Sequence, residues 1–77
     1  MFNSTQKDAD MVSNTIWRLP EVMARTGISR SGIYDKMSKG EFPQSINLGP
    51  RAVGWVADEI IDWINEQIEK SRRRNFA

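Results

Sequence analysis

The chain has 77 residues and a formal net charge of +1, and it contains neither cysteine nor histidine. A chain of this length holds one domain, and the missing residue types exclude disulfides and thiolate or imidazole metal sites. No apolar run approaches the roughly 20 residues of a membrane span, and the N-terminus lacks the pattern of a secretory signal. We therefore expect a cytoplasmic protein without a membrane partner.

The first part of the chain predicts an arm followed by a short helix. Residues 1–15 are polar and show no sustained period, which predicts a flexible N-terminal arm. Residues 19–26 place their apolar side chains on one face at helical spacing. Pro20 suits the first turn of that helix, and Gly27 suits its C-terminal stop.

A second helix is predicted for residues 30–38. Ser29 is a favourable N-cap for it, and Ile28, Ile33 and Met37 supply its inner face. The linker between the two helices consists only of Gly27, Ile28 and Ser29. A short, glycine-containing turn between two helices is the pattern of a helix-turn-helix.

A β-hairpin is predicted next. Residues 45–48 and 53–55 both alternate in polarity, and the intervening residues 49–52 include Gly49 and Pro50, which favour a turn. A hairpin beside a helix-turn-helix is a wing. Trp55 is expected in the core, because a small domain gains much from each buried aromatic ring.

The last helix is predicted for residues 57–70. Trp63 is expected in the core, and the remaining residues 71–77 are expected to form a basic, disordered tail. The buried stripe of the helix is expected to consist of Ile60, Ile61, Ile64 and Ile68. The predicted fold is therefore mainly α with a small β-hairpin, a winged helix-turn-helix over residues 16–70.

Charge is unevenly distributed along the chain. Residues 15–51 carry six basic and three acidic side chains, whereas residues 57–69 carry five acidic and no basic ones. A basic front of this kind indicates an anionic partner such as DNA. The acidic side chains of the last helix are read as a solvated face that can also repel DNA.

The second helix carries most of the candidate DNA contacts. Short hydroxyls, a phenol and cations suit a helix that enters the major groove, where hydroxyls bond to base edges and cations neutralise phosphates. An ordinary solvated amphipathic helix is the alternative for this helix alone. The predicted DNA-binding residues are Ser29, Arg30, Ser31, Tyr34, Asp35, Lys36, Lys39 and, at the hairpin tip, Arg51.

Several segments together resemble the AlpA family of prophage regulators, over about 50 of the 77 residues. They are residues 18–22, 26–31, 33–34, 40–43, 51–55 and 63–64. The resemblance implies a winged-helix relative of MerR-type and excisionase-type DNA binders, with residues 29–38 as the reading helix and a wing centred on Arg51. Two positions depart from the pattern: Gly32 stands where the family usually has threonine, and Asp35 where a basic residue is common.

The function predicted from residues and resemblance is sequence-specific binding of double-stranded DNA, without catalysis or cofactor, at the nucleoid. Arg30, Ser31, Tyr34 and Asp35 are assigned to the major groove. Lys36, Lys39 and Arg51 are assigned to the phosphate backbone of the DNA. Two alternatives stay open: an excisionase-like directionality factor that acts with an integrase, and a protein-binding adaptor that docks through the second helix. A lone domain with few phosphate contacts is expected to need a homo-oligomer on DNA or a recombinase partner.

Overall fold

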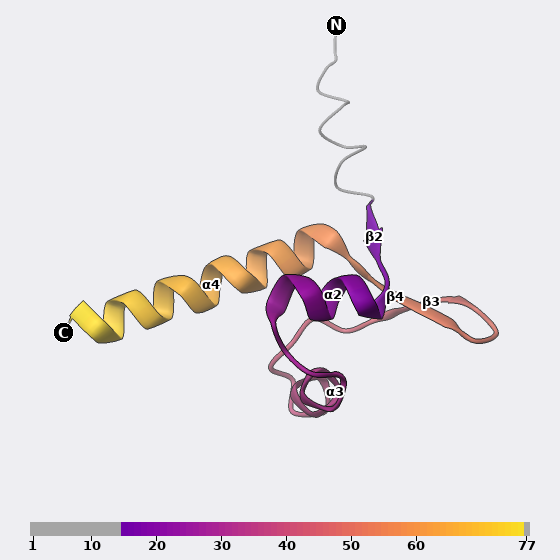
Figure 1. Ribbon diagram of the computed structural model, residues 1–77, viewed down its shortest axis with the longest axis horizontal. Coiled ribbons are helices and arrows are strands. Elements are labelled where there is room, and N and C mark those ends of the chain that lie inside the picture. Colours follow the sequence, from indigo (N-terminus) through magenta and orange to yellow (C-terminus); the bar gives the residue numbers. More distant parts are fainter. Residues whose placement is uncertain (1–14, 77) are drawn as a thin grey trace, which may run out of the picture.

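The computed structural model describes residues 15–76, which form three helices and a three-stranded antiparallel sheet (Figure 1). The predicted arm at residues 1–15 lies outside the described part except for Thr15. In chain order the elements are β2 (Ile16–Trp17), α2 (Leu19–Thr26), α3 (Arg30–Ser38), β3 (Ile46–Gly49), β4 (Ala52–Val56) and α4 (Ala57–Phe76).

The helix-turn-helix of α2 and α3 has the predicted bounds. Gly27 ends α2 in the left-handed conformation with a φ of 76°, and its N–H donates to Met23 O at 2.8 Å. Thr26 reinforces the turn, because its hydroxyl donates to Val22 O at 2.8 Å and accepts the Ile28 N–H at 3.2 Å. A positive φ is readily adopted only by glycine. The left-handed Gly27 and the bonds of Thr26 together fix the angle at which α3 leaves α2.

The sheet has one strand more than the predicted hairpin. Its strand order is β2-β4-β3, with Ile16 paired to Val56 and Trp17 to Trp55. The Ala57 N–H extends this pairing by donating to Thr15 O at 2.8 Å. A strand of two residues is too short to show a period of two, so the sequence pattern contains no signal for β2.

The hairpin of β3 and β4, which we call the wing, shows one face to the core and one away from it. Trp55 is fully buried. Ile46 pairs with Gly54, so it lies on the opposite face, because side chains alternate along a strand. Ile46 and Leu48 are accordingly 39% and 44% exposed.

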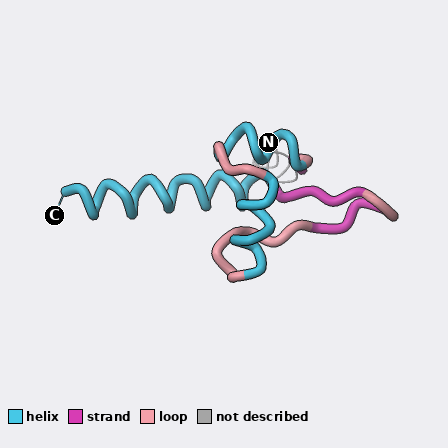
Figure 2. Tube along the Cα trace, turned by 60° about the horizontal axis from the view of Figure 1, so that its bottom comes forward, coloured by secondary structure: helices cyan, strands magenta, loops and turns pink. Residues whose placement is uncertain are grey.

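Helix α4 differs from the prediction in two ways. It continues to Phe76, so the residues expected as a disordered tail are helical as far as residue 76. The expected stripe of buried isoleucines is wrong for two of its members: Ile60 is fully buried, but Ile61 and Ile68 are 42% and 41% exposed. Figures 1 and 2 show the reason for Ile68, since the distal half of α4 extends away from the other elements. Ile61 lies in the first turns, but it is turned by about 100° around the helix axis from the buried Ile60.

The core lies between α2, α3, β4 and the first turns of α4. Its fully buried side chains are Val22, Ile33, Trp55 and Ile60, with Phe42 at 5% exposure. Trp63, expected in the core, is only half-buried and packs edge-on against Phe42 at a centroid distance of 4.8 Å. Within residues 15–76, no helix is long and apolar enough to span a bilayer.

Candidate nucleic-acid interface

The start of α3 is held by Ser29. This residue has the extended backbone of an N-cap, and its Oγ accepts the Gly32 N–H at 3.2 Å. Its carbonyl accepts the Ile33 N–H at 2.9 Å. The hydroxyl predicted to contact DNA is therefore already engaged in capping the start of the helix, and the principal effect of Ser29 is to orient the residues that follow it.

Gly32 allows α3 to begin this close to the turn. A Cβ added at this position would lie 2.7 Å from Cγ2 of Ile28 and 3.2 Å from Oγ of Ser29. The first distance is shorter than real Cβ contacts show, so any larger residue requires a shift of the turn. Gly32, which departs from the family pattern, is thus explained by the close packing of α3 against Ile28 in the turn.

One flank of α3 faces the wing. The Tyr34 ring lies 6.3 Å from the Trp55 ring, tilted by 59°, and the Arg30 guanidinium lies 5.7 Å above the Tyr34 ring. Tyr34 is 37% exposed. This stack holds Arg30 and Tyr34, two predicted DNA-binding side chains, together beside β4. The contact is favourable because a cation is attracted to the face of an aromatic ring.

Trp55 supports this stack and was identified from the sequence only as a core residue. Its Nε1 donates to Pro43 O at 3.1 Å, so the indole is fixed by the segment that follows α3. The sequence signal for Trp55 is its place as the last of the alternating residues 53–55 of the hairpin. Nothing in the one-dimensional pattern indicated that Tyr34 would lie against it.

The outward side of α3 combines hydroxyls with an ion pair. Ser31 and Ser38 are exposed, and the Ser38 hydroxyl donates to Asp35 O at 2.7 Å. Lys39 Nζ lies 3.1 Å from Asp35 Oδ2. The hydrogen bond from the Lys39 ammonium to Asp35, together with the charge of that carboxylate, raises the pKa of Lys39 above its ordinary value. Asp35 thus partly neutralises a cation that was predicted to bind phosphate.

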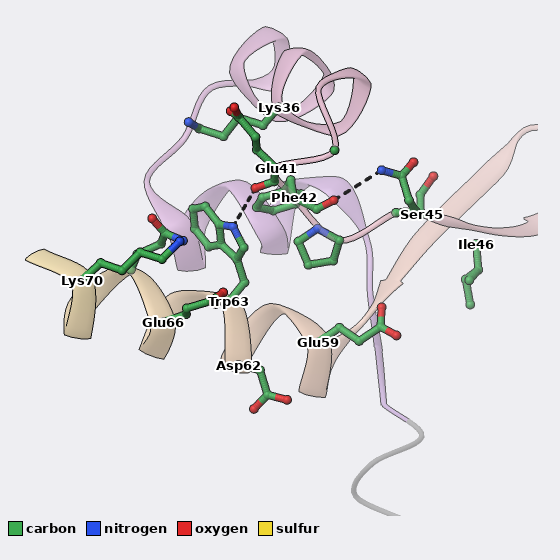
Figure 3. Close-up of a pocket in the computed structure, with 14 residues that line it drawn as sticks. Lys36, Glu41, Phe42, Ser45, Ile46, Glu59, Asp62, Trp63, Glu66 and Lys70 are labelled. Atoms are coloured by element: carbon green, nitrogen blue, oxygen red, sulfur yellow. Dashed lines mark hydrogen bonds between the residues drawn. The ribbon is translucent and has the colours of Figure 1, made fainter.

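Lys36 lies on the other flank of α3, beside α4. It lines a groove formed by the segment after α3 and the outer side of α4 (Figure 3). Glu59 and Glu66 of α4 line the same groove, together with Lys70, and Asp62 contributes to its edge with a carboxylate that points away from α3. The carboxylates outnumber the one cation that α4 contributes to the groove, so this flank has an acidic neighbour. Trp63 forms part of the groove wall, and its Nε1 donates to Glu41 O at 2.9 Å.

Arg51 lies in the turn between β3 and β4 and is exposed. The two strands are paired with an irregularity between Asn47 and Gly49, and the tip of the wing points away from the helices (Figure 1). The structure therefore groups Arg30, Ser31 and Tyr34 on and beside one flank of α3, and it separates them from Lys36 and from the Arg51 tip.

The described residues offer no metal site. Among residues 15–76, no three histidine, cysteine, aspartate or glutamate side chains stand close enough to hold an ion. The arrangement of hydroxyls, a phenol and guanidinium groups on a short helix is suited to hydrogen bonding and charge neutralisation.

Comparison with known proteins gives the family and the relatives to which the chain is similar. Residues 15–68 match the family described as "Prophage CP4-57 regulatory protein (AlpA)". The chain is 39% identical over 64 residues to "Uncharacterized protein ORF88" of Enterobacteria phage P4, covering 83% of this chain and 73% of the relative. It is 36% identical over 58 residues to "DNA-binding transcriptional activator AlpA" of Escherichia coli (strain K12), covering 68% of this chain and 83% of the relative.

Proposed function

Because the chain belongs to the AlpA family of prophage regulators, we propose that it binds double-stranded DNA sequence-specifically and regulates transcription of prophage genes. The observation that carries the proposal is the flank of α3 on which Arg30 lies over Tyr34 and Tyr34 lies against Trp55. A helix with cationic and hydroxylated side chains near its N-terminus, beside a hairpin, is suited to insertion into a major groove.

The proposed contacts divide into side chains that bind base edges and side chains that bind the DNA backbone. Arg30 has the paired donors that bind guanine O6 and N7, and its stacking on Tyr34 reduces the rotamer freedom that binding would otherwise cost. Ser31 can bond to a base edge or a phosphate. Asp35 can accept a hydrogen bond from a cytosine amino group, while Lys36, Lys39 and Arg51 contribute charge toward the backbone.

The direct test is fluorescence anisotropy with duplexes tiled across the genomic neighbourhood of the protein's own gene, measured over a salt series. We expect one fragment to bind best, with log K falling linearly with log salt by about 0.9 for each phosphate neutralised. Arg30→Ala is expected to weaken binding to that fragment by about 1–3 kcal/mol and to relax its sequence preference. Arg51→Ala is expected to weaken all fragments similarly and to reduce the salt slope by about 1.

Arg73→Ala is the matched control, because Arg73 is an exposed arginine on α4 outside both α3 and the wing. Its binding curve should resemble that of the unmodified protein. The proposal fails if no fragment binds at low salt, or if binding does not depend on salt. Retained DNA binding in the double variant Arg30→Ala/Arg51→Ala would also contradict the assignment of the surface and favour a protein-binding role for α3.

Transcription and recombination are separated by a second measurement. A reporter fused to the promoter nearest the bound fragment should respond to expression of the protein and not to the Arg30→Ala variant. If the reporter is silent but excision of the element by its integrase increases, the DNA reader serves recombination instead of transcription.

A further inference from the structure

Helix α4 carries a line of isoleucines that the domain covers only in part. Ile61 and Ile68 are 42% and 41% exposed, and Ile64, which packs against the core, is half-buried. Positions separated by three and four residues lie on one face of a helix, so the three isoleucines form a continuous stripe. Figures 1 and 2 show the second half of α4 standing apart from α2, α3 and the wing. We call Ile61, Ile64 and Ile68 the α4 stripe.

The α4 stripe is distinct from the groove described above. Asp62 and Glu66, which line the groove, are separated from the stripe by a rotation of at least about 100° around the helix axis, since each residue advances by that angle. Figure 3 shows Glu59 and Glu66 near the groove, on the side of the segment that follows α3. A partner on the stripe would therefore leave the groove open.

The charges of α4 indicate what covers the stripe. Residues 57–69 carry five acidic and no basic side chains, and residues 70–74 carry four basic and no acidic ones. Two such helices side by side in the same direction would place like charges together. Running in opposite directions, they would place the acidic half of each beside the basic half of the other, which is favourable.

We propose that two copies of this chain associate through antiparallel packing of α4, with Ile64 of each copy against Ile68 of the other. The two-fold axis then passes the helix at the level of Glu66, midway between the two isoleucines. The same register sets Ile61 opposite Ser71, and it places Arg72 of the second copy two residues, about 3 Å along the helix axis, from the level of Asp58. An isologous two-fold contact of this kind closes on itself and gives a dimer.

The contact is short. From Ile61 to Ser71 the helix rises about 15 Å. A contact of this length gives a reversible dimer whose population depends on protein concentration. The two α3 helices, one from each copy, lie at opposite ends of the dimer. The proposal goes beyond the proposed function and its test contains no DNA, so each can fail independently of the other.

Sedimentation velocity over a dilution series tests the association. The unmodified protein should shift from monomer toward dimer as concentration rises, and Ile68→Glu should remain monomeric. Ile46→Glu is the matched control, because Ile46 is an isoleucine of similar exposure, 39%, on the wing. Circular dichroism of each variant establishes that it is folded. A monomer at every concentration for the unmodified protein overturns the proposal, as does loss of the dimer in Ile46→Glu alone.

Direction and register are tested by charge exchange and by cross-linking. Asp58→Arg and Arg72→Asp should each weaken the dimer several-fold, and the double variant should recover it. The chain has no cysteine, so a single introduced cysteine can form a disulfide only with the same residue of a second copy. Asn65→Cys, near the two-fold axis, should form a disulfide-linked dimer on mild oxidation much faster than Arg72→Cys, which lies near the end. Equal cross-linking rates, or no recovery in the charge exchange, would overturn the antiparallel register.

Discussion

Replacing Gly32 with alanine has two opposing effects on the stability of the domain. A glycine inside a helix costs about 0.8–1.0 kcal/mol relative to alanine, because it has more backbone freedom to lose. From helix propensity alone, Gly32→Ala should raise the free energy of unfolding by about 1 kcal/mol.

The packing of α3 on the turn reverses this expectation. The new Cβ would lie 2.7 Å from Cγ2 of Ile28 and 3.2 Å from Oγ of Ser29. Ile28 packs against the core, and a β-branched side chain has a stiff χ1, so the methyl group cannot simply rotate away. Overpacking of this kind costs about 1–3 kcal/mol. We therefore expect a net loss of about 1 kcal/mol, which lowers the Tm of a domain this small by about 4–8 °C.

Thermal and urea denaturation followed by tryptophan fluorescence measures the effect. The Ile28→Ala background removes the opposing methyl group, so there Gly32→Ala should stabilise the domain by about 1 kcal/mol. The two backgrounds then differ by a coupling free energy of about 2 kcal/mol. An increase in stability for Gly32→Ala in the unmodified protein, with no coupling to Ile28, would refute the packing argument.

Three further substitutions test other parts of the structure. Ser29→Ala removes the cap that accepts the Gly32 N–H and should lower the free energy of unfolding by about 1 kcal/mol; an unchanged urea midpoint would contradict the cap. Phe42→Ala empties a core position that is 5% exposed and should cost about 3–5 kcal/mol, enough to leave little helical circular dichroism at 37 °C. Asp35→Asn removes the carboxylate that pairs with Lys39, so the pKa of Lys39 should fall toward its ordinary value. The affinity for non-specific duplex should rise, and the salt dependence of DNA binding should steepen by about 1. Identical salt slopes for the two proteins would show that Lys39 does not reach phosphate.

The parts of the fold that the sequence predicts well are those set by neighbouring residues. The bounds of α2 and α3 follow from Pro20, Gly27 and Ser29, whose effects on the backbone act within one turn of the helix. The pairing of Ile16 with Val56 involves residues far apart in the sequence, and only two residues of β2 take part. No local pattern encodes such a contact, so β2 could not be foreseen.

The misjudged positions share a different cause. Phe42 precedes Pro43 and reads as part of a helix break, yet its ring enters the core at 5% exposure and supports Trp63. The isoleucines of α4 show the reverse error. A helical period identifies the apolar face of a helix, but how far along the helix that face is covered depends on the size of the domain. Ile60 is covered and Ile68 is not.

The same reasoning limits what can be read from the charges on α3. Its cations look equivalent in the sequence, but they lie in different surroundings. Lys36 lines the groove opposite the carboxylates of α4, and Lys39 is paired with Asp35. Arg30 instead lies over Tyr34 on the wing side. Because acidic side chains repel the DNA backbone, a duplex that approaches α3 is favoured on the Arg30 flank and opposed on the Lys36 flank. The orientation of the domain on DNA is thus proposed to depend on the placement of acidic side chains as much as on the basic ones.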